Sequence, residues 1–107
     1  MTITERKLNN FSIISLKGIL NASSAPKLKT YFEQLPEAES VVIDLEQVDF
    51  LDSSGLGVLV GIARRKKASN AVFKLSNLNE RVKKVFMITQ AYTLFDIYDE
   101  LTAAVGE

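Results

Sequence analysis

Short, nearly continuous apolar runs alternate along the chain with longer segments in which apolar residues recur every three or four positions. The clearest run is 41–45 (Val-Val-Ile-Asp-Leu), whose β-branched composition is typical of a central strand covered on both faces. Weaker runs predict further strands at 3–7, 11–17, 71–75 and 93–98. The turn-forming pair Asn9-Asn10 separates the first two strands, so we expect a hairpin whose second strand ends at Gly18.

Two of the intervening segments carry apolar stripes with helical spacing. The first helix is predicted to begin at a serine cap, Ser23 or Ser24, and to end at Pro36. The second is predicted to begin after the cap Asn79 and to end at Ile88. The apolar faces are expected to consist of Leu28, Tyr31, Phe32 and Leu35 in the first helix and of Val82, Val85 and Phe86 in the second.

This alternation of strands and helices predicts the α/β fold class. We expect a mixed β-sheet with an antiparallel N-terminal hairpin, parallel strands joined through helices, and about four helices in all. The last of these is a short terminal helix over 99–105, with Asp99 as its cap. Binding sites in such sheets lie beyond the carboxyl ends of the strands, which directs attention to the turn predicted between Leu45 and Ser53.

A further amphipathic segment begins directly after that turn, at 52–54 (Asp-Ser-Ser). All three side chains can accept hydrogen bonds from the unpaired N–H groups of a first helical turn. Gly57 and Gly61 each cost a helix about 1 kcal/mol relative to alanine, which indicates that another backbone or a partner approaches them closely. The basic run 64–67 complements the helix dipole, and we interpret it as a solvated face. The buried face is predicted to consist of Leu56, Leu59, Val60 and Ala63.

Composition narrows the classes of function. The 107 residues, 47% of them hydrophobic, suffice for a single domain over residues 1–107 without disulfides or metals. Thirteen basic and thirteen acidic residues balance, which argues against nucleic acid or an anionic membrane as a partner. Because the chain has no histidine and no cysteine, it lacks the usual general base, thiol nucleophile and metal ligands. We therefore expect a binding protein rather than an enzyme, with no cofactor and no metal.

The chain shows no sequence signal for a membrane or for export. Met1–Lys7 lacks the apolar core of a signal peptide, and nowhere do about 18 apolar residues run together. We expect a cytoplasmic protein whose partners are other proteins. Aromatic and apolar residues near the end of the chain could line a pocket, but we interpret them as closing the core and assign them no site, namely Met87, Ile88, Tyr92, Phe95 and Tyr98.

Ser53, at the start of the central helix, has three possible roles. As a nucleophile it would need an oriented base, and Asp52 is only its neighbour in sequence. As a cap, together with Asp52 and Ser54, it would contribute about 1 kcal/mol to stability and nothing more. As a phosphorylation site it would place about −1.5 to −2 charges at a helix N-terminus, which tolerates negative charge. A partner docked over the phosphate would not tolerate that charge. The residue types leave the last two roles open.

The motif Asp52-Ser-Ser-Gly-Leu-Gly57, in its place after the strand 41–45, resembles the signature of the STAS-domain anti-sigma factor antagonists, the SpoIIAA-like anti-anti-sigma factors. The resemblance covers nearly the whole chain and implies a STAS-like single domain. It also implies that Ser53 is the residue that is phosphorylated. The partner-binding surface that it implies comprises Asn21, Asp52, Ser53, Ser54, Gly55, Leu56 and Gly57.

The same resemblance implies partner switching. The unphosphorylated protein would bind an anti-sigma factor that is also a GHKL-type serine kinase, and a sigma factor would be released. Phosphorylation would end this binding, and a PP2C-type phosphatase would restore it. The chain departs from the family pattern at 18–21, where Gly-Ile-Leu-Asn replaces the common Gly-Glu-Leu-Asp and removes two carboxylates near the motif. The alternative is a STAS adaptor subunit of a transport or regulatory assembly that docks without phosphorylation.

Overall fold

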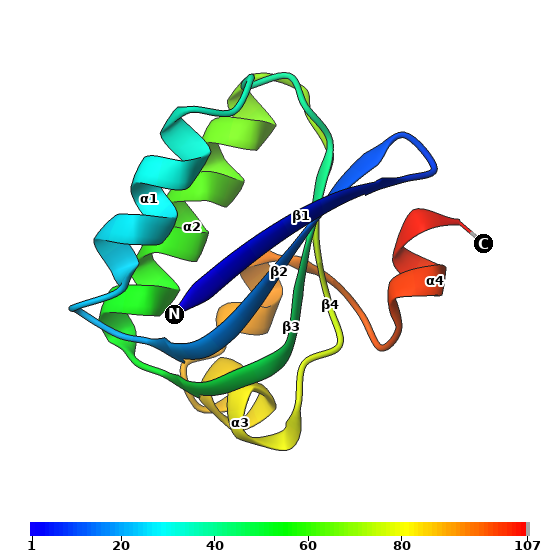
Figure 1. Ribbon diagram of the computed structural model, residues 1–107. Helices are drawn as coiled ribbons and strands as arrows, with labels where there is room; N and C mark the ends of the chain where they lie inside the picture. The colour runs from blue at the N-terminus through cyan, green and yellow to red at the C-terminus, as the bar shows by residue number, and fades with distance from the viewer. Residues whose placement is uncertain (107) are drawn as a thin grey trace.

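A computed structural model describes residues 1–106 as one sheet flanked by helices (Figure 1). The strands are β1 (Thr2–Leu8), β2 (Phe11–Leu20), β3 (Val41–Leu51), β4 (Phe73–Ser76) and β5 (Asp96–Tyr98). The helices are α1 (Ala25–Glu33), α2 (Ser53–Ala68), α3 (Glu80–Ile88), the 3₁₀ helix η1 (Ala91–Leu94) and α4 (Leu101–Val105). The strands lie in chain order, with β1 antiparallel to β2 and every other neighbouring pair parallel. The predicted α/β class and mixed sheet are confirmed.

The N-terminal hairpin turns at Asn9 and Asn10, whose φ angles are 49° and 68°. A two-residue hairpin turn needs positive φ at both central residues so that its twist matches the strands. Asparagine enters this left-handed region more readily than most residues that carry a side chain. The predicted hairpin is therefore confirmed, with Leu8 paired to Phe11 next to the turn.

Strand β2 continues beyond Gly18, where the sequence predicts its end. Gly18 has a φ of 112°, a conformation that residues with a side chain rarely adopt, and the pairing with β3 shifts register beside it. The glycine therefore forms a bulge within the strand rather than a stop. As a result β2 reaches Leu20.

Strand β3 continues to Leu51, through the stretch where the sequence predicts a turn between Leu45 and Ser53. Its buried side chains there are Leu45, Val48 and Leu51, which are three positions apart because the irregular pairing with β2 interrupts strict alternation. Only Asp52 separates this strand from the first residue of α2. The end of β3 thus fixes the position of the start of α2.

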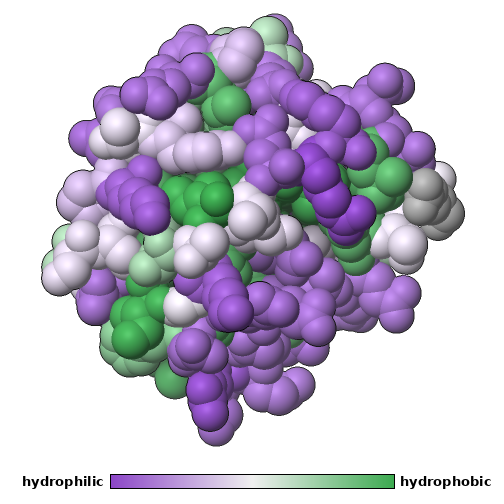
Figure 2. Space-filling model, viewed as in Figure 1, coloured by the Kyte–Doolittle hydropathy of each residue, from purple (hydrophilic) through white to green (hydrophobic). Residues whose placement is uncertain are grey.

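The helices cover both faces of the sheet unequally. Helices α1, α2 and α3 lie against one face and the short α4 lies against the other (Figure 1). In the same view the surface is mostly hydrophilic, with apolar side chains showing at a few places (Figure 2). The smaller core, under α4, consists of Ile13, Val42, Ala104 and Val105.

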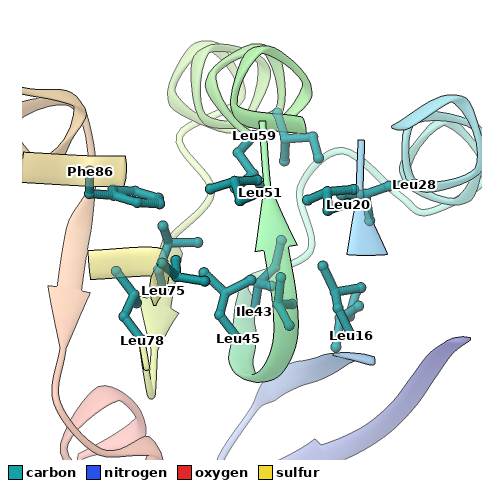
Figure 3. Packing of buried hydrophobic residues seen from close by; sticks show 14 of the residues in the cluster. Leu16, Leu20, Leu28, Ile43, Leu45, Leu51, Leu59, Leu75, Leu78 and Phe86 are labelled. Carbon is teal, nitrogen blue, oxygen red and sulfur yellow. The ribbon is translucent and has the colours of Figure 1, made fainter. Parts of the chain in front are cut away.

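The larger core lies between the sheet and the three helices. Leu28 of α1, Leu59 of α2 and Phe86 of α3 lie against side chains of the strands (Figure 3). Strand residues Ile43 and Leu75 are fully buried between them. This layer holds α2 against the carboxyl ends of β2 and β3.

The buried face of α2 differs by about one position from the prediction. Leu59 is buried, as predicted, whereas Leu56, Val60 and Ala63 are only half-buried. The other helix residues that face the core are Gly55, Ile62 and Lys66. A lysine and a glycine on the core face explain why the apolar pattern selects the wrong side of the helix.

Lys66 faces the core because its ammonium group finds backbone partners. Its Nζ donates to the carbonyl oxygens of Pro36, Glu37 and Glu39 at 3.2, 3.2 and 2.7 Å. These carbonyls belong to the loop that joins α1 to β3. Burial lowers the pKa of Lys66. The lysine thus ties the C-terminal end of α2 to the loop that leads into the central strand.

The C-terminal third follows the prediction through α3. Asn79 caps this helix, with Oδ1 accepting from the N–H of Val82 at 3.0 Å, and Val82 and Phe86 are buried as expected. The strand predicted at 71–75 is shorter and begins at Phe73. The strand predicted at 93–98 is divided into η1 and the three-residue β5.

Two predictions for the end of the chain are wrong. Asp99 does not cap α4, because Glu100 occupies the N-cap position and makes no side-chain cap bond. Met87 and Ile88 in the last turn of α3, and Tyr92 in η1, do not close the core, because all three are exposed. Among residues 1–106 no helix has the length and apolar character needed to cross a membrane.

Candidate functional site

Among residues 1–106, Asp52 is the residue whose side chain caps the start of α2. Asp52 is in an extended conformation, and its Oδ1 accepts from the N–H of Gly55 at 3.0 Å. Its own N–H donates to the carbonyl of Leu20 at 3.2 Å, and its carbonyl accepts from Leu56 at 2.9 Å. Asp52 therefore caps α2 and also ties the cap to the end of β2.

Ser53 and Ser54 follow the cap and are both exposed. In residues 1–106 their hydroxyls make no hydrogen bond, so neither serine shares the capping role that the residue types allow. Their backbone N–H groups precede the first intrahelical bond and belong to the set that a helix start leaves without partners. The two hydroxyls and these N–H groups are presented to solvent at the positive end of the helix dipole.

Gly55 is buried directly behind the two serines. A Cβ added there would lie 2.6 Å from the carbonyl oxygen of Leu20 and 2.8 Å from Cδ1 of Leu51. Only glycine lets α2 approach the ends of β2 and β3 this closely. The predicted place of Gly55 in the partner-binding surface must therefore be corrected, since this residue packs against the strands and not at the surface.

Asn21 lies directly after Leu20 and shapes the loop before α1. Its Oδ1 accepts from the N–H groups of Ser23 and Ser24 at 3.0 and 3.2 Å. Ser24 occupies the N-cap position of α1 without capping it, because its hydroxyl donates to the carbonyl of Ile19 at 2.6 Å. Asn21 thus orders the loop between the end of β2 and the start of α1, and it is half-exposed there.

Two exposed apolar side chains, which the sequence reasoning missed, lie next to this start. Ile19 and Phe50 are paired across β2 and β3 and are 48% and 53% exposed. Figure 2 shows apolar surface at the lower left, over the ends of these strands in Figure 1. The sequence does contain a sign of this exposure, the successive apolar residues Phe50 and Leu51. Because successive residues of a strand point to opposite faces, only one of the two can face the core.

A groove of about 310 Å³ runs from Ser54 along α2. Gly57, Val58 and Gly61 line it on α2, and Lys29 lines it on α1. A Cβ added at Gly57 or Gly61 would meet nothing within 4 Å. The close contact predicted from these two glycines is therefore not made within residues 1–106, and an approach by a partner stays a prediction.

The arrangement suits binding rather than chemistry. The carboxylate of Asp52, adjacent in sequence to Ser53, is already engaged as the helix cap. No cluster of three residues able to hold a metal ion is found among residues 1–106. A polar helix start with exposed apolar neighbours has the mixed character of a protein-docking surface.

Comparisons with known proteins agree with this geometry. The model of the STAS domain family matches residues 2–104. The chain is 35% identical over 85 residues to the anti-sigma-B factor antagonist of Bacillus subtilis, covering 78% of each protein. It is 33% identical over 97 residues to the anti-sigma-B factor antagonist of Listeria monocytogenes, covering 89% of this chain and 84% of that protein.

The solved structures of the anti-sigma factor antagonist SpoIIAA share the fold. The unphosphorylated form aligns with a TM-score of 0.73 at 20% identity, covering 96% of this chain and 93% of that one. The phosphorylated form of this Bacillus protein aligns with a TM-score of 0.68, also at 20% identity, covering 96% of each chain. At this identity the likeness concerns the fold alone.

The fold is that of a small α/β module with one mixed sheet, and its candidate site is the exposed start of α2. The chain belongs to the STAS domain family. The relatives that it matches are anti-sigma factor antagonists, which are regulatory binding proteins rather than enzymes. The sequence prediction of family and fold is confirmed.

Proposed function

We propose that this protein is an anti-sigma factor antagonist that switches partners through phosphorylation of Ser53. The unphosphorylated form binds an anti-sigma factor that is a GHKL-type serine kinase, and a sigma factor is released. Phosphorylation ends this binding, and a PP2C-type phosphatase restores it. The observation that carries the proposal is that Asp52 alone caps α2, which leaves the exposed Ser53 hydroxyl without a structural role.

The fold tolerates a phosphate at this position. A phosphoserine carries about −1.5 to −2 charges, and the positive end of a helix dipole favours such an anion. The N–H groups of Ser53 and Ser54 are available to it, because the cap engages the N–H of the next residue, Gly55. The core behind the serines is formed by Gly55, Leu20 and Leu51 and is not disturbed by a group added on the outside.

A docked partner does not tolerate the phosphate. Ile19 and Phe50 give the surface around Ser53 apolar side chains that a partner would cover. A new dianion enclosed there, beside the carboxylate of Asp52, would lose its hydration and be repelled, at a cost of several kcal/mol. Several kcal/mol correspond to at least about a hundredfold loss of affinity. The switch therefore acts on the interface and not on the fold.

The relatives support this proposal by their names. Two proteins that share about a third of the sequence are named anti-sigma-B factor antagonists. SpoIIAA, which shares the fold, has been solved in an unphosphorylated and a phosphorylated form. In this chain the serine that directly follows the capping aspartate is Ser53.

The test is the affinity for the partner that co-purifies with this protein from its own cells, measured by calorimetry. Ser53→Asp should weaken binding about a hundredfold or more, because it places a negative charge within the interface. Ser53→Ala should keep the affinity within a few-fold and remove the phosphate acceptor. Thermal unfolding should be nearly the same for both variants, since the side chain of Ser53 contributes no cap.

Thr102→Asp is the matched control. Thr102 is exposed in the first turn of α4, on the opposite face of the sheet, so the substitution adds the same charge at a helix start away from the site. It should bind as the natural protein does. If Ser53→Asp binds as tightly as Thr102→Asp, the switch is wrong. A partner without kinase activity would then favour the adaptor function.

A further inference from the structure

A second hollow lies on a part of the surface that shares no lining residue with the start of α2. It has a volume of about 490 Å³ and follows the edge of the sheet, with α3 and η1 on one side and β5 on the other. Leu78, Phe86, Met87, Tyr92 and Ile97 give it apolar walls. We call it the β5 groove.

Exposed apolar side chains continue from the wall of this groove. Met87 and Ile88, in the last turn of α3, are 68% and 81% exposed, and Tyr92 and Leu94 of η1 are 51% and 56% exposed. Single exposed apolar residues are ordinary, but four within eight positions, two of them lining the groove, are a concentration of the kind found at interaction sites. Within residues 1–106 no other part of the chain covers these four side chains.

The strand beside the groove has an unpaired backbone edge. β5 is the last strand of the sheet, and its Tyr98 carbonyl accepts from the N–H of Asn77 at 3.3 Å, so residue 98 directs its backbone groups inward. Because successive residues of a strand point their N–H and C=O groups in opposite directions, Ile97 presents both of its groups outward. Its side chain pairs with Leu75 on the face that carries α3. A strand added beside β5 could pair with the N–H and C=O groups of Ile97 and place its apolar side chains in the β5 groove.

Charge at this edge indicates which chain can occupy it. Asp96, Asp99 and Glu100 are exposed along β5 and just beyond it, while Lys83, which lines the groove on α3, lies 3.8 Å from the carboxylate of Glu80. Pairing with a second copy would bring these carboxylates within reach of the same carboxylates of that copy, which like-charge repulsion disfavours. A partner with lysine or arginine beside its apolar residues would instead be complementary.

We propose that the β5 groove binds an extended segment of a partner protein as a sixth strand beside β5, with alternate apolar side chains in the groove and basic side chains beside Asp96 and Asp99. Backbone pairing with Ile97 sets the register of the partner segment, and the apolar walls select which of its side chains fit. The site is independent of Ser53, so it offers a second attachment whatever the phosphorylation state.

An unbiased library of displayed nine-residue peptides, selected on the full chain, tests the proposal. Enriched peptides should alternate apolar with other residues and carry at least one lysine or arginine. In their complexes the amide of Ile97 should exchange with solvent at least tenfold more slowly. The double substitution Asp96→Lys, Asp99→Lys should weaken these peptides about tenfold or more, while its thermal unfolding stays close to that of the natural chain because both residues are exposed.

Ser53→Asp separates this site from the proposed switch. The variant should bind the selected peptides as the natural chain does, so a failure of either proposal leaves the other intact. Three results would overturn the β5 site: a selection that enriches no peptide, an Ile97 amide whose exchange is unchanged in the complexes, and peptides that bind the lysine double variant equally well.

Discussion

The three glycines of helix α2 differ in what a side chain at each position would contact. Gly55 is buried, and a Cβ at this position would collide with Leu20 and Leu51. Gly57 and Gly61 face open space, and a Cβ there would touch nothing within 4 Å. The first glycine sets how closely α2 approaches the sheet, whereas the other two keep the groove along α2 open.

These two situations predict opposite effects of alanine on stability. Gly55→Ala should lower the free energy of unfolding by about 1–3 kcal/mol, because the added methyl group overlaps a backbone carbonyl that cannot move freely. Gly57→Ala, the matched control, should raise it by as much as about 1 kcal/mol, because alanine favours the helix and meets no neighbour. Urea unfolding of the two variants measures both changes. Stabilisation by Gly55→Ala would contradict the packing described for the start of α2.

Tyr31 contributes to stability in a way that depends on alkaline pH. Partial burial, followed by its hydrogen bond to Glu5, raises the pKa of Tyr31 to about 12 from an ordinary value of 10.0. The folded state therefore holds this proton at a pH where the unfolded state has lost it. The contribution is present below pH 10 and is lost as the pH rises towards 12.

An ultraviolet titration of the folded protein should accordingly show one tyrosine ionising later than the rest. Tyr31→Phe should remove the late step and flatten the dependence of stability on pH over this interval. Tyr92→Phe is the control, since Tyr92 is exposed and should leave the late step in place. A late step that survives Tyr31→Phe would exclude Tyr31 as its source.

At the scale of elements, the sequence predicts those whose local pattern agrees with their tertiary environment. Helix α3 has its cap at Asn79 and its core residues Val82 and Phe86 at the expected spacing. The hairpin turn at 9–10 is equally local. The end of β3 could not be predicted, because its bulged pairing with β2 replaces alternation by a spacing of three. Pairing is a property of two strands, and no single segment encodes it.

The candidate site, too, has features that the local sequence predicts and features that depend on how elements pack together. Asp52 is correctly predicted as a cap because capping chemistry is local to a helix start, whereas the role of Ser53 rests on the family resemblance and stays a prediction. Ile19 and Phe50 are missed, since their exposure depends on where two strands end relative to one helix. The burial of Gly55 is missed for the same reason.

Lys66 offers a test at the scale of one helix. Lys66→Met should lower the free energy of unfolding by about 1–3 kcal/mol, because three carbonyls of the α1–β3 loop lose their donor. Lys67→Met is the control: Lys67 is exposed, so its replacement should change stability by no more than about 0.5 kcal/mol. Chemical unfolding measures both. Equal effects would show that the contacts of Lys66 contribute nothing beyond its charge.

For the whole molecule, a net charge of zero leaves recognition to local surfaces. The start of α2 combines exposed serines with apolar neighbours, and the β5 groove combines an apolar trough with carboxylates. The two surfaces share no residue. Under the two proposals, one small protein presents a surface that phosphorylation switches and a second surface that it leaves unchanged.

The docking surface around Ser53 predicts a specific loss of affinity. Phe50→Ala should weaken the co-purifying partner about tenfold or more, because a large apolar side chain at the centre of an interface often dominates binding. Its effect on unfolding should be small, since Phe50 is more than half exposed. Val72→Ala is the control: Val72 is exposed just before β4, and its carbonyl accepts from the N–H of Val41, at the opposite end of β3 from Phe50. Titration calorimetry with both variants decides whether the partner covers this surface.

The most direct test of the switch is phosphosite mapping by mass spectrometry on this protein recovered from its own cells, during growth and under stress, with co-purified partners identified from the same sample. We predict phosphate on Ser53 whose occupancy changes between conditions, and an ATP-binding serine kinase bound to the unphosphorylated pool only. Ser53 unmodified in every condition, together with a partner that is not a kinase, would contradict the switch.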